Sequence, residues 1–106
     1  MSETIRAMLK ELKRGLLSAY GGRLKGVFLF GSYARDEADE ESDIDVLVVL
    51  DKIEHYPAEV ERTSFLISQV SLKYGRSISC VYVTEDKWLN DRTMFFLNVR
   101  EEAIPA

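Results

Sequence analysis

The sequence predicts an α/β (α+β) fold in which a small mixed β-sheet of about three strands is flanked by helices. Segments with helical periodicity alternate along the chain with short, continuous apolar runs, a pattern typical of strands connected by helices. The 106 residues, of which 46% are hydrophobic and 30% charged, indicate a single globular domain over residues 1–106 and argue against a disordered chain.

The first predicted element is an amphipathic helix over residues 3–20. Its apolar residues recur at intervals of three and four, Ser2 or Thr4 can cap its start, and Gly21-Gly22 ends it. The apolar run at 26–30 that follows is too short for a helix, so we expect a buried strand there.

Beyond this strand, the chain turns at Gly31-Ser32, where we expect a short helix over residues 32–38 and then an acidic loop. Residues 44–50 are β-branched and apolar apart from Asp45, which makes them the clearest strand of the chain.

A long helix is predicted over residues 57–74, because Pro57 suits a first turn and Gly75 a C-terminal end. Its predicted common face consists of Val60, Thr63, Ile67, Val70 and Tyr74. A third strand over 77–84 follows, with Thr84 capping a helical turn, and residues 92–100 are expected to form the last helix.

Half of the acidic residues lie in one short window. Residues 36–54 hold nine of the 18 acidic side chains and one basic one, within a net charge of −4. This distribution argues against a stable nucleic-acid clamp and favours a cation site or a solvated loop around residues 36–45. One cysteine and one histidine exclude an internal disulfide and the common zinc sites.

The chain has no apolar run of 18 residues, and its N-terminus lacks the apolar core of a signal peptide. We therefore expect no membrane span and a reduced, cytoplasmic location. A chain of this size buries only part of its unfolded surface, so a partner protein or a homo-oligomer would stabilise it further.

Two motifs carry candidate chemistry. Gly31 and Ser32 end a buried strand, where exposed backbone amides can bind phosphate, and Arg35 lies one helical turn further on. Asp43 and Asp45 are two residues apart at the start of the next strand, so both carboxylates point to one side. Such a pair repels unless a hard cation such as Mg²⁺ lies between the carboxylates.

Other known motifs do not fit these residues, but an ordinary structural role stays open. The chain has no P-loop, and an EF-hand beginning at Asp39 would need glycine and glutamate where Ile44 and Leu50 stand. Taken alone, the Gly-Ser turn and the Asp-x-Asp pair are also compatible with an ordinary turn and a solvated strand entry.

The combination resembles the minimal nucleotidyltransferases of the DNA polymerase β-like superfamily. The family pattern of Gly-Ser-x-Ala-Arg followed by Ser-Asp-x-Asp and an apolar strand is matched by residues 31–35 and 42–49. The resemblance implies a nucleotidyltransferase fold and transfer of a nucleotidyl group, adenylyl from ATP above all, to a hydroxyl acceptor.

The same resemblance implies roles for individual residues. Asp43 and Asp45 would be catalytic and would ligate Mg²⁺, whereas Gly31, Ser32, Arg35 and Ser42 would bind the nucleotide. Arg35 would either assist at the phosphates or brace the acidic loop. The family further implies a helical HEPN-domain protein as partner, within a toxin–antitoxin pair.

The sequence departs from the family pattern in two ways. Asp36 replaces a glycine, and the third strand lacks the acid that serves the attacking hydroxyl in active members. Ser77 or Ser79 would take its place, with Glu85 or Asp86 as more distant substitutes. Three hypotheses follow: an active nucleotidyltransferase, a weakened nucleotide- and metal-binding module that restrains a partner, or a plain interaction domain.

Overall fold

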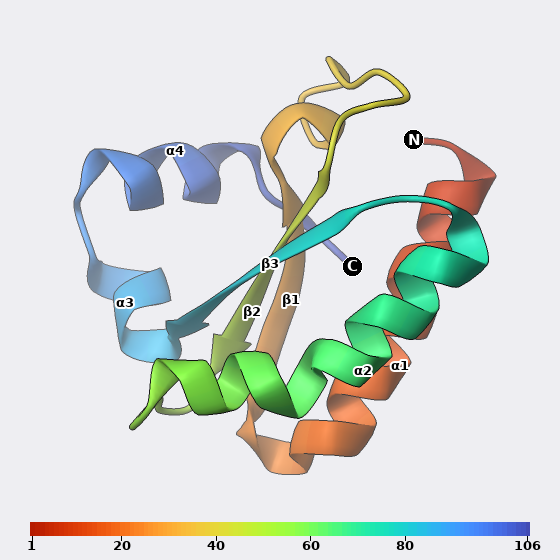
Figure 1. Cartoon of the computed structure of the whole chain (residues 1–106). Helices are drawn as coiled ribbons and strands as arrows, with labels where there is room; N and C mark the ends of the chain where they lie inside the picture. The colour runs from red at the N-terminus through yellow and green to blue at the C-terminus, as the bar shows by residue number, and fades with distance from the viewer.

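The computed structural model describes residues 1–106 as one mixed sheet covered on both faces by helices (Figure 1). The elements in chain order are α1 Glu3–Tyr20, η1 Gly21–Arg23, β1 Leu24–Phe30, η2 Gly31–Tyr33, β2 Ile44–Leu50, α2 Tyr56–Tyr74, β3 Ile78–Thr84, α3 Glu85–Asn90, α4 Met94–Glu102 and β4 Ile104–Pro105. The strand order is β3-β2-β1-β4. The predicted α+β class, with helices flanking a small mixed sheet, is confirmed.

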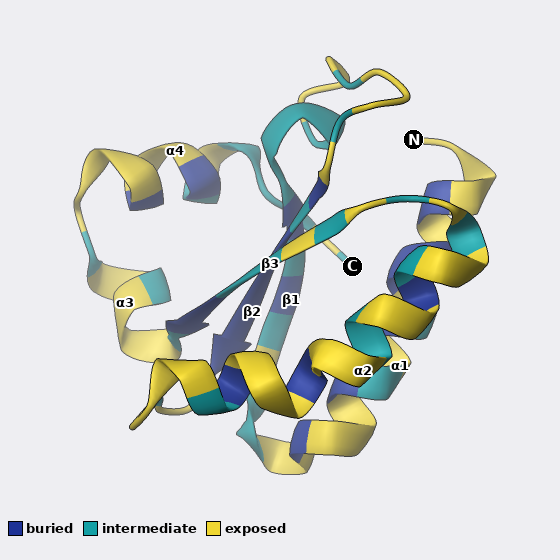
Figure 2. Cartoon of the chain, in the orientation of Figure 1, coloured by how far each residue is buried: buried dark blue, intermediate teal, exposed yellow.

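Strand β2 is the centre of the sheet and has a partner on each side. It pairs antiparallel with β1 and parallel with β3, so that Asp45 lies opposite Phe30 on one neighbour and Ser79 on the other. All residues from Val46 to Leu50 are buried, as expected for an apolar strand covered on both faces (Figure 2).

The alternation of side chains along β2 divides the core into two layers. Ile44, Val46, Val48 and Leu50 pack with α1, whose inner face is Ile5, Met8, Leu9, Leu12, Leu16 and Tyr20. Leu47 and Val49 point the other way and pack with Phe96 and Val99 of α4. By the same alternation Asp45 lies on the α4 face of the sheet.

Local capping agrees with the sequence at several helix ends. The hydroxyl of Ser2, rather than Thr4, caps α1 by accepting a hydrogen bond from the Ile5 amide at 3.2 Å. The hydroxyl of Thr84 likewise accepts from the Lys87 amide, and Gly75 ends α2 in the left-handed conformation.

The structure differs from the expectations at three places. The predicted helix over 32–38 is only a 3₁₀ turn, because Asp36 adopts a positive φ of 58° that ends any helix there. A fourth strand, β4, pairs with Phe28 and Leu29 of β1; its two residues, one a proline, are too few for any periodic signal.

The third difference concerns the buried face of α2. Glu59 is buried, whereas Val60, expected on the inner face, is 45% exposed. The Glu59 carboxylate accepts hydrogen bonds from Tyr20, Arg23 and Arg62 at 3.0 to 3.2 Å, which offsets the cost of burying its charge. These partners come from α1, η1 and α2.

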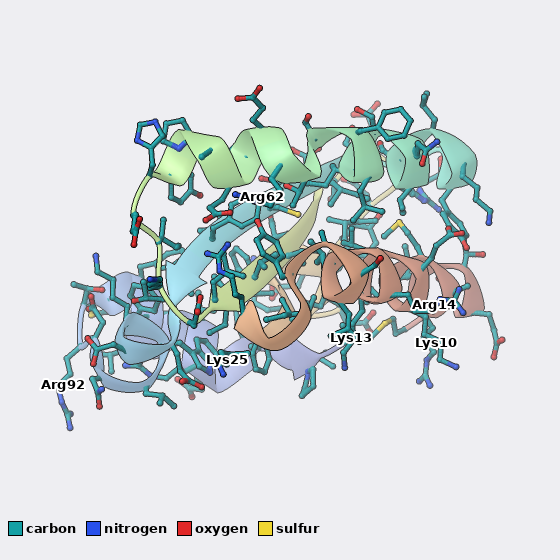
Figure 3. The ribbon with its side chains drawn as sticks, turned by 90° about the horizontal axis from the view of Figure 1, so that it is seen from below. Lys10, Lys13, Arg14, Lys25, Arg62 and Arg92 are labelled. Atoms are coloured by element: carbon teal, nitrogen blue, oxygen red, sulfur yellow. The ribbon has the colours of Figure 1, made fainter.

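Basic side chains project from several elements, as Figure 3 shows for Lys10, Lys13, Arg14, Lys25, Arg62 and Arg92. None of these six lines the site described below. No helix is both long and apolar enough to cross a membrane.

Candidate active site

The turn after β1 lies directly against the start of β2. Gly31 has a φ of +76°, and a Cβ placed on it would collide with the side chain of Asp45, lying 3.0 Å from Cγ and overlapping Oδ2. Only a glycine therefore fits both the backbone conformation and the space. The Gly-Ser turn and Asp45 of the Asp-x-Asp motif, separated in sequence, therefore meet at one place.

The two aspartates differ in environment. Asp45 is half-buried, while Asp43, just before β2, is exposed. Burial is the main reason that the pKa of Asp45 is raised above its ordinary value, and the negative charge of Asp43 raises it further. The carboxylates thus repel each other, which is the condition under which a divalent cation binds most favourably between them.

A third acidic residue, which the sequence argument did not identify, completes the site from the far end of the chain. The carboxylate of Glu102, the last residue of α4, accepts a hydrogen bond from the Gly31 amide at 2.6 Å. It also forms an ion pair with the Arg35 guanidinium at 3.1 Å. The two donors predicted to hold phosphate are therefore aimed at one anionic group.

A hollow of about 410 Å³ opens over these groups. Its lining residues are Phe30, Gly31, Ser32, Arg35, Asp45, Phe95, Asn98, Val99 and Glu102. Four of the six predicted site residues are among them. The hollow brings together the Gly31 amide, the Arg35 guanidinium and the carboxylates of Asp45 and Glu102.

The two remaining predicted residues, Asp43 and Ser42, lie outside this lining. The Ser42 hydroxyl donates to the Asp39 carboxylate at 3.2 Å and accepts from the Asp39 amide at 3.0 Å. In this arrangement Ser42 orders the acidic loop that leads into Asp43. Arg35 also binds within its own loop, through an ion pair with Glu37 at 3.3 Å.

On the third strand, β3, the residue that pairs with Asp45 is Ser79. Of the two serines considered, Ser79 lies beside Asp45 in the parallel pairing of β2 with β3, whereas Ser77 precedes the strand. Glu85 and Asp86 begin α3 at the opposite end of β3, about 20 Å along the strand, so they cannot substitute. No cluster of three or more metal-ligating side chains forms anywhere in the chain.

The sequence model for the nucleotidyltransferase domain matches residues 9–100, which include every residue of the two motifs. This chain belongs to the nucleotidyltransferase domain family.

Relatives of this nucleotidyltransferase domain agree with that assignment. The protein named "Putative protein adenylyltransferase MJ0604" of Methanocaldococcus jannaschii is 40% identical over 97 residues, which cover 89% of each chain. A solved structure described as "putative minimal nucleotidyltransferase" superposes with a TM-score of 0.69 at 25% identity, over 98% of this chain and 94% of the other.

A crystal structure of a toxin–antitoxin with AMP-PNP superposes with a TM-score of 0.62, over 89% of this chain and 68% of the other. At 19% identity this match shows a common fold. The family is thus that of minimal nucleotidyltransferases, as the motifs implied.

The donor set of this nucleotidyltransferase domain suits one Mg²⁺ ion. Mg²⁺ keeps several waters and is commonly bound by one or two carboxylates together with substrate phosphates. Asp43 and Asp45 supply that number of carboxylates, and the mutual repulsion felt by Asp45 would be relieved by the ion. Three or more metal-ligating side chains gather nowhere in the chain, so the two aspartates are the donors that the protein offers at this place.

Proposed function

We propose that this domain transfers an adenylyl group from ATP, in the presence of Mg²⁺, to a hydroxyl group of a partner protein. The observation that carries the proposal is the contact between the Gly31 turn and Asp45, with the Gly31 amide and Arg35 aimed at one anion. A triphosphate on these donors would lie next to the carboxylate that holds its metal.

Each residue has a role in this scheme. Gly31 and Ser32 bind the β- and γ-phosphates, Arg35 neutralises part of their charge, and Asp43 with Asp45 holds Mg²⁺. The ion, when bound, would draw charge from the phosphate oxygens and orient the triphosphate. Ser42 positions Asp43 by ordering the loop before it.

The transfer itself is an in-line displacement at the α-phosphorus. The acceptor hydroxyl oxygen forms a bond to this phosphorus, the bond to the oxygen bridging to the β-phosphate breaks, and pyrophosphate leaves with the electron pair. The hydroxyl proton passes to water or to a base of the acceptor protein, because Ser79 cannot act as a base at neutral pH.

The partner is proposed to be a helical protein of the HEPN class in a toxin–antitoxin pair. Supporting this are the adenylyltransferase name of the 40% identical relative and the toxin–antitoxin structure of the same fold. Phe95 of α4 lines the hollow and is 44% exposed, which leaves an apolar side chain at the site available to a partner protein. The reaction would take place in the cytoplasm, where ATP and Mg²⁺ are available.

One observation favours a second candidate function. Ser79 occupies the register position beside Asp45 where active relatives are expected to carry an acid. A domain that binds nucleotide and Mg²⁺ without activating an acceptor would act by restraining its partner. A homo-oligomer is a second assembly that either function would allow.

The test uses ATP labelled in the α-phosphate, Mg²⁺ and the co-purified product of the adjacent gene as acceptor. Transfer of label to that protein, lost in an Asp43→Asn/Asp45→Asn double variant, supports the enzyme. The matched control is Glu40→Gln/Glu41→Gln, which removes two exposed charges from the same loop. Mg²⁺-dependent thermal stabilisation by ATP without transfer supports the restraining module. If ATP gives neither label transfer nor stabilisation, both candidate functions are refuted.

A further inference from the structure

Glu102 places a negative charge on the very donors that the proposed function assigns to phosphate. Its carboxylate is 2.6 Å from the Gly31 nitrogen and 3.1 Å from Nη1 of Arg35, with its side chain only 19% exposed. Both contacts involve charged groups, which makes them stronger than neutral hydrogen bonds. A phosphate oxygen cannot occupy the same positions while Glu102 is there.

The segment around Glu102 holds the carboxylate in reach of the turn. Its helix α4 packs on the sheet through Phe96 and Val99, and the next residues form β4 on the edge of β1. The Ala106 amide donates to the Val27 carbonyl at 2.9 Å, which closes this attachment.

The position of Glu102 is unfavourable for the helix itself. Glu101 and Glu102 end α4, where the partial negative charge of a helix C-terminus repels acids. The hydrogen bond from Gly31 and the ion pair with Arg35 offset that repulsion, so the carboxylate gains more from the turn than from its own helix.

Glu102 does not stand in for the missing third-strand acid. The β1 turn and the β3 serine lie on opposite sides of Asp45, because β2 separates β1 from β3 in the sheet. Glu102 contacts the β1 side, where phosphates are expected, and not the Ser79 side, where an acceptor hydroxyl would be activated.

We propose that Glu102 is an internal competitor of the nucleotide: its carboxylate occupies the phosphate donors in the free protein and must leave them when a triphosphate binds. The inference rests on the proposed function, since it assumes that a triphosphate uses Gly31 and Arg35. Part of the binding free energy is then used to break the two Glu102 contacts, which lowers the apparent affinity.

The test compares Mg²⁺-ATP and inorganic tripolyphosphate binding to the wild-type domain and to Glu102→Gln by calorimetry. The glutamine keeps the size of the side chain and one oxygen acceptor but removes the charge, so we expect roughly tenfold tighter binding of both ligands. Glu101→Gln is the matched control, an exposed neighbour with no contact to the turn, and should bind as the wild type does.

The outcomes separate the two proposals. Binding to the wild type with equal or weaker binding to Glu102→Gln overturns the competitor role alone. No binding to either protein overturns the proposed function and the competitor role with it.

A measurement on the wild-type domain covers the case in which the variant does not fold. The carboxyl carbon resonance of Glu102 and the amide resonance of Gly31 should shift together as tripolyphosphate is added. A shift at Gly31 with none at Glu102 contradicts the displacement.

Discussion

Replacing Gly31 by alanine tests the geometry on which the site depends. The new Cβ would meet the Asp45 side chain at 3.2 Å from Cβ and 3.0 Å from Cγ, and would overlap the carboxylate oxygen. The φ of +76° adds a backbone cost of about 1–2 kcal/mol for any residue other than glycine. Moving Asp45 aside costs roughly a further 1–3 kcal/mol, as for other overpacked sites.

Gly75 provides the matched control for the backbone cost. Its φ of +64° is also positive, but a Cβ placed on it meets no atom within 4 Å. Gly75→Ala should therefore lose only about 1–2 kcal/mol of unfolding free energy. Any gain from stiffening the unfolded chain is common to both variants, so the difference between them reports the Asp45 contact.

The assay is equilibrium urea unfolding followed by Trp88 fluorescence, at constant pH. We expect Gly31→Ala to be less stable than Gly75→Ala, and the excess to shrink when Asp45 is also replaced by alanine. The coupling free energy between the Gly31→Ala and Asp45→Ala substitutions should be on the order of 1–2 kcal/mol. Equal costs for the two glycines, unchanged by Asp45→Ala, would show that the Gly-Ser turn and Asp45 do not meet.

Three further predictions follow from the same structure. Ser79→Asp should raise Mg²⁺-dependent label transfer at least severalfold, because it places a carboxylate beside Asp45. The control Ser79→Asn should leave the rate unchanged. An unchanged rate in Ser79→Asp would show that a third catalytic acid does not belong at this position. In Glu59, burial raises the pKa, but hydrogen bonds from Arg23, Tyr20 and Arg62 outweigh it and leave the pKa below its ordinary value. Near this pKa the folded protein binds fewer protons than the unfolded chain, so the stability that Glu59 contributes is lost as the pH falls below about 4.3 and through the lowered pKa. In urea unfolding, the free energy of unfolding of Glu59→Gln should therefore fall less steeply with acid than that of the wild type. Parallel dependences of this free energy on pH would contradict the prediction. Leu16→Ala, at a fully buried position of α1, should cost about 2–5 kcal/mol in the same assay, and a cost below 1 kcal/mol would contradict the packing of α1 on the sheet.

The long helices and the three main strands were open to prediction because each depends on short-range pattern, whereas the predicted helix over 32–38 is only a 3₁₀ turn. The helix at 3–20 has the predicted bounds, and β2 coincides with the apolar run at 44–50. Gly31 and Asp45 meet because adjacent antiparallel strands bring the end of one beside the start of the next.

The pairing of β3 with β2 was needed to choose between Ser77 and Ser79. Both serines share a face of an isolated strand, so alternation alone leaves them equivalent. The parallel register places Ser79, and not Ser77, beside Asp45. Register is a property of two strands together, which no pattern within one of them contains.

Glu59 and Glu102 mark the limit of local pattern. A glutamate on a helix surface is ordinarily solvated, and nothing nearby in the chain distinguishes these two from Glu61 or Glu101. Glu59 is buried because Tyr20, 39 residues away, and Arg23, 36 away, satisfy its carboxylate; Glu102 meets a Gly31 amide that is 71 residues distant. The amino-acid order thus determined the long helices, the three main strands and the two motifs. The carboxylate that lies on the phosphate donors was decided only by folding, because hydrogen bonds between groups this far apart in the chain exist only once the sheet has brought them together.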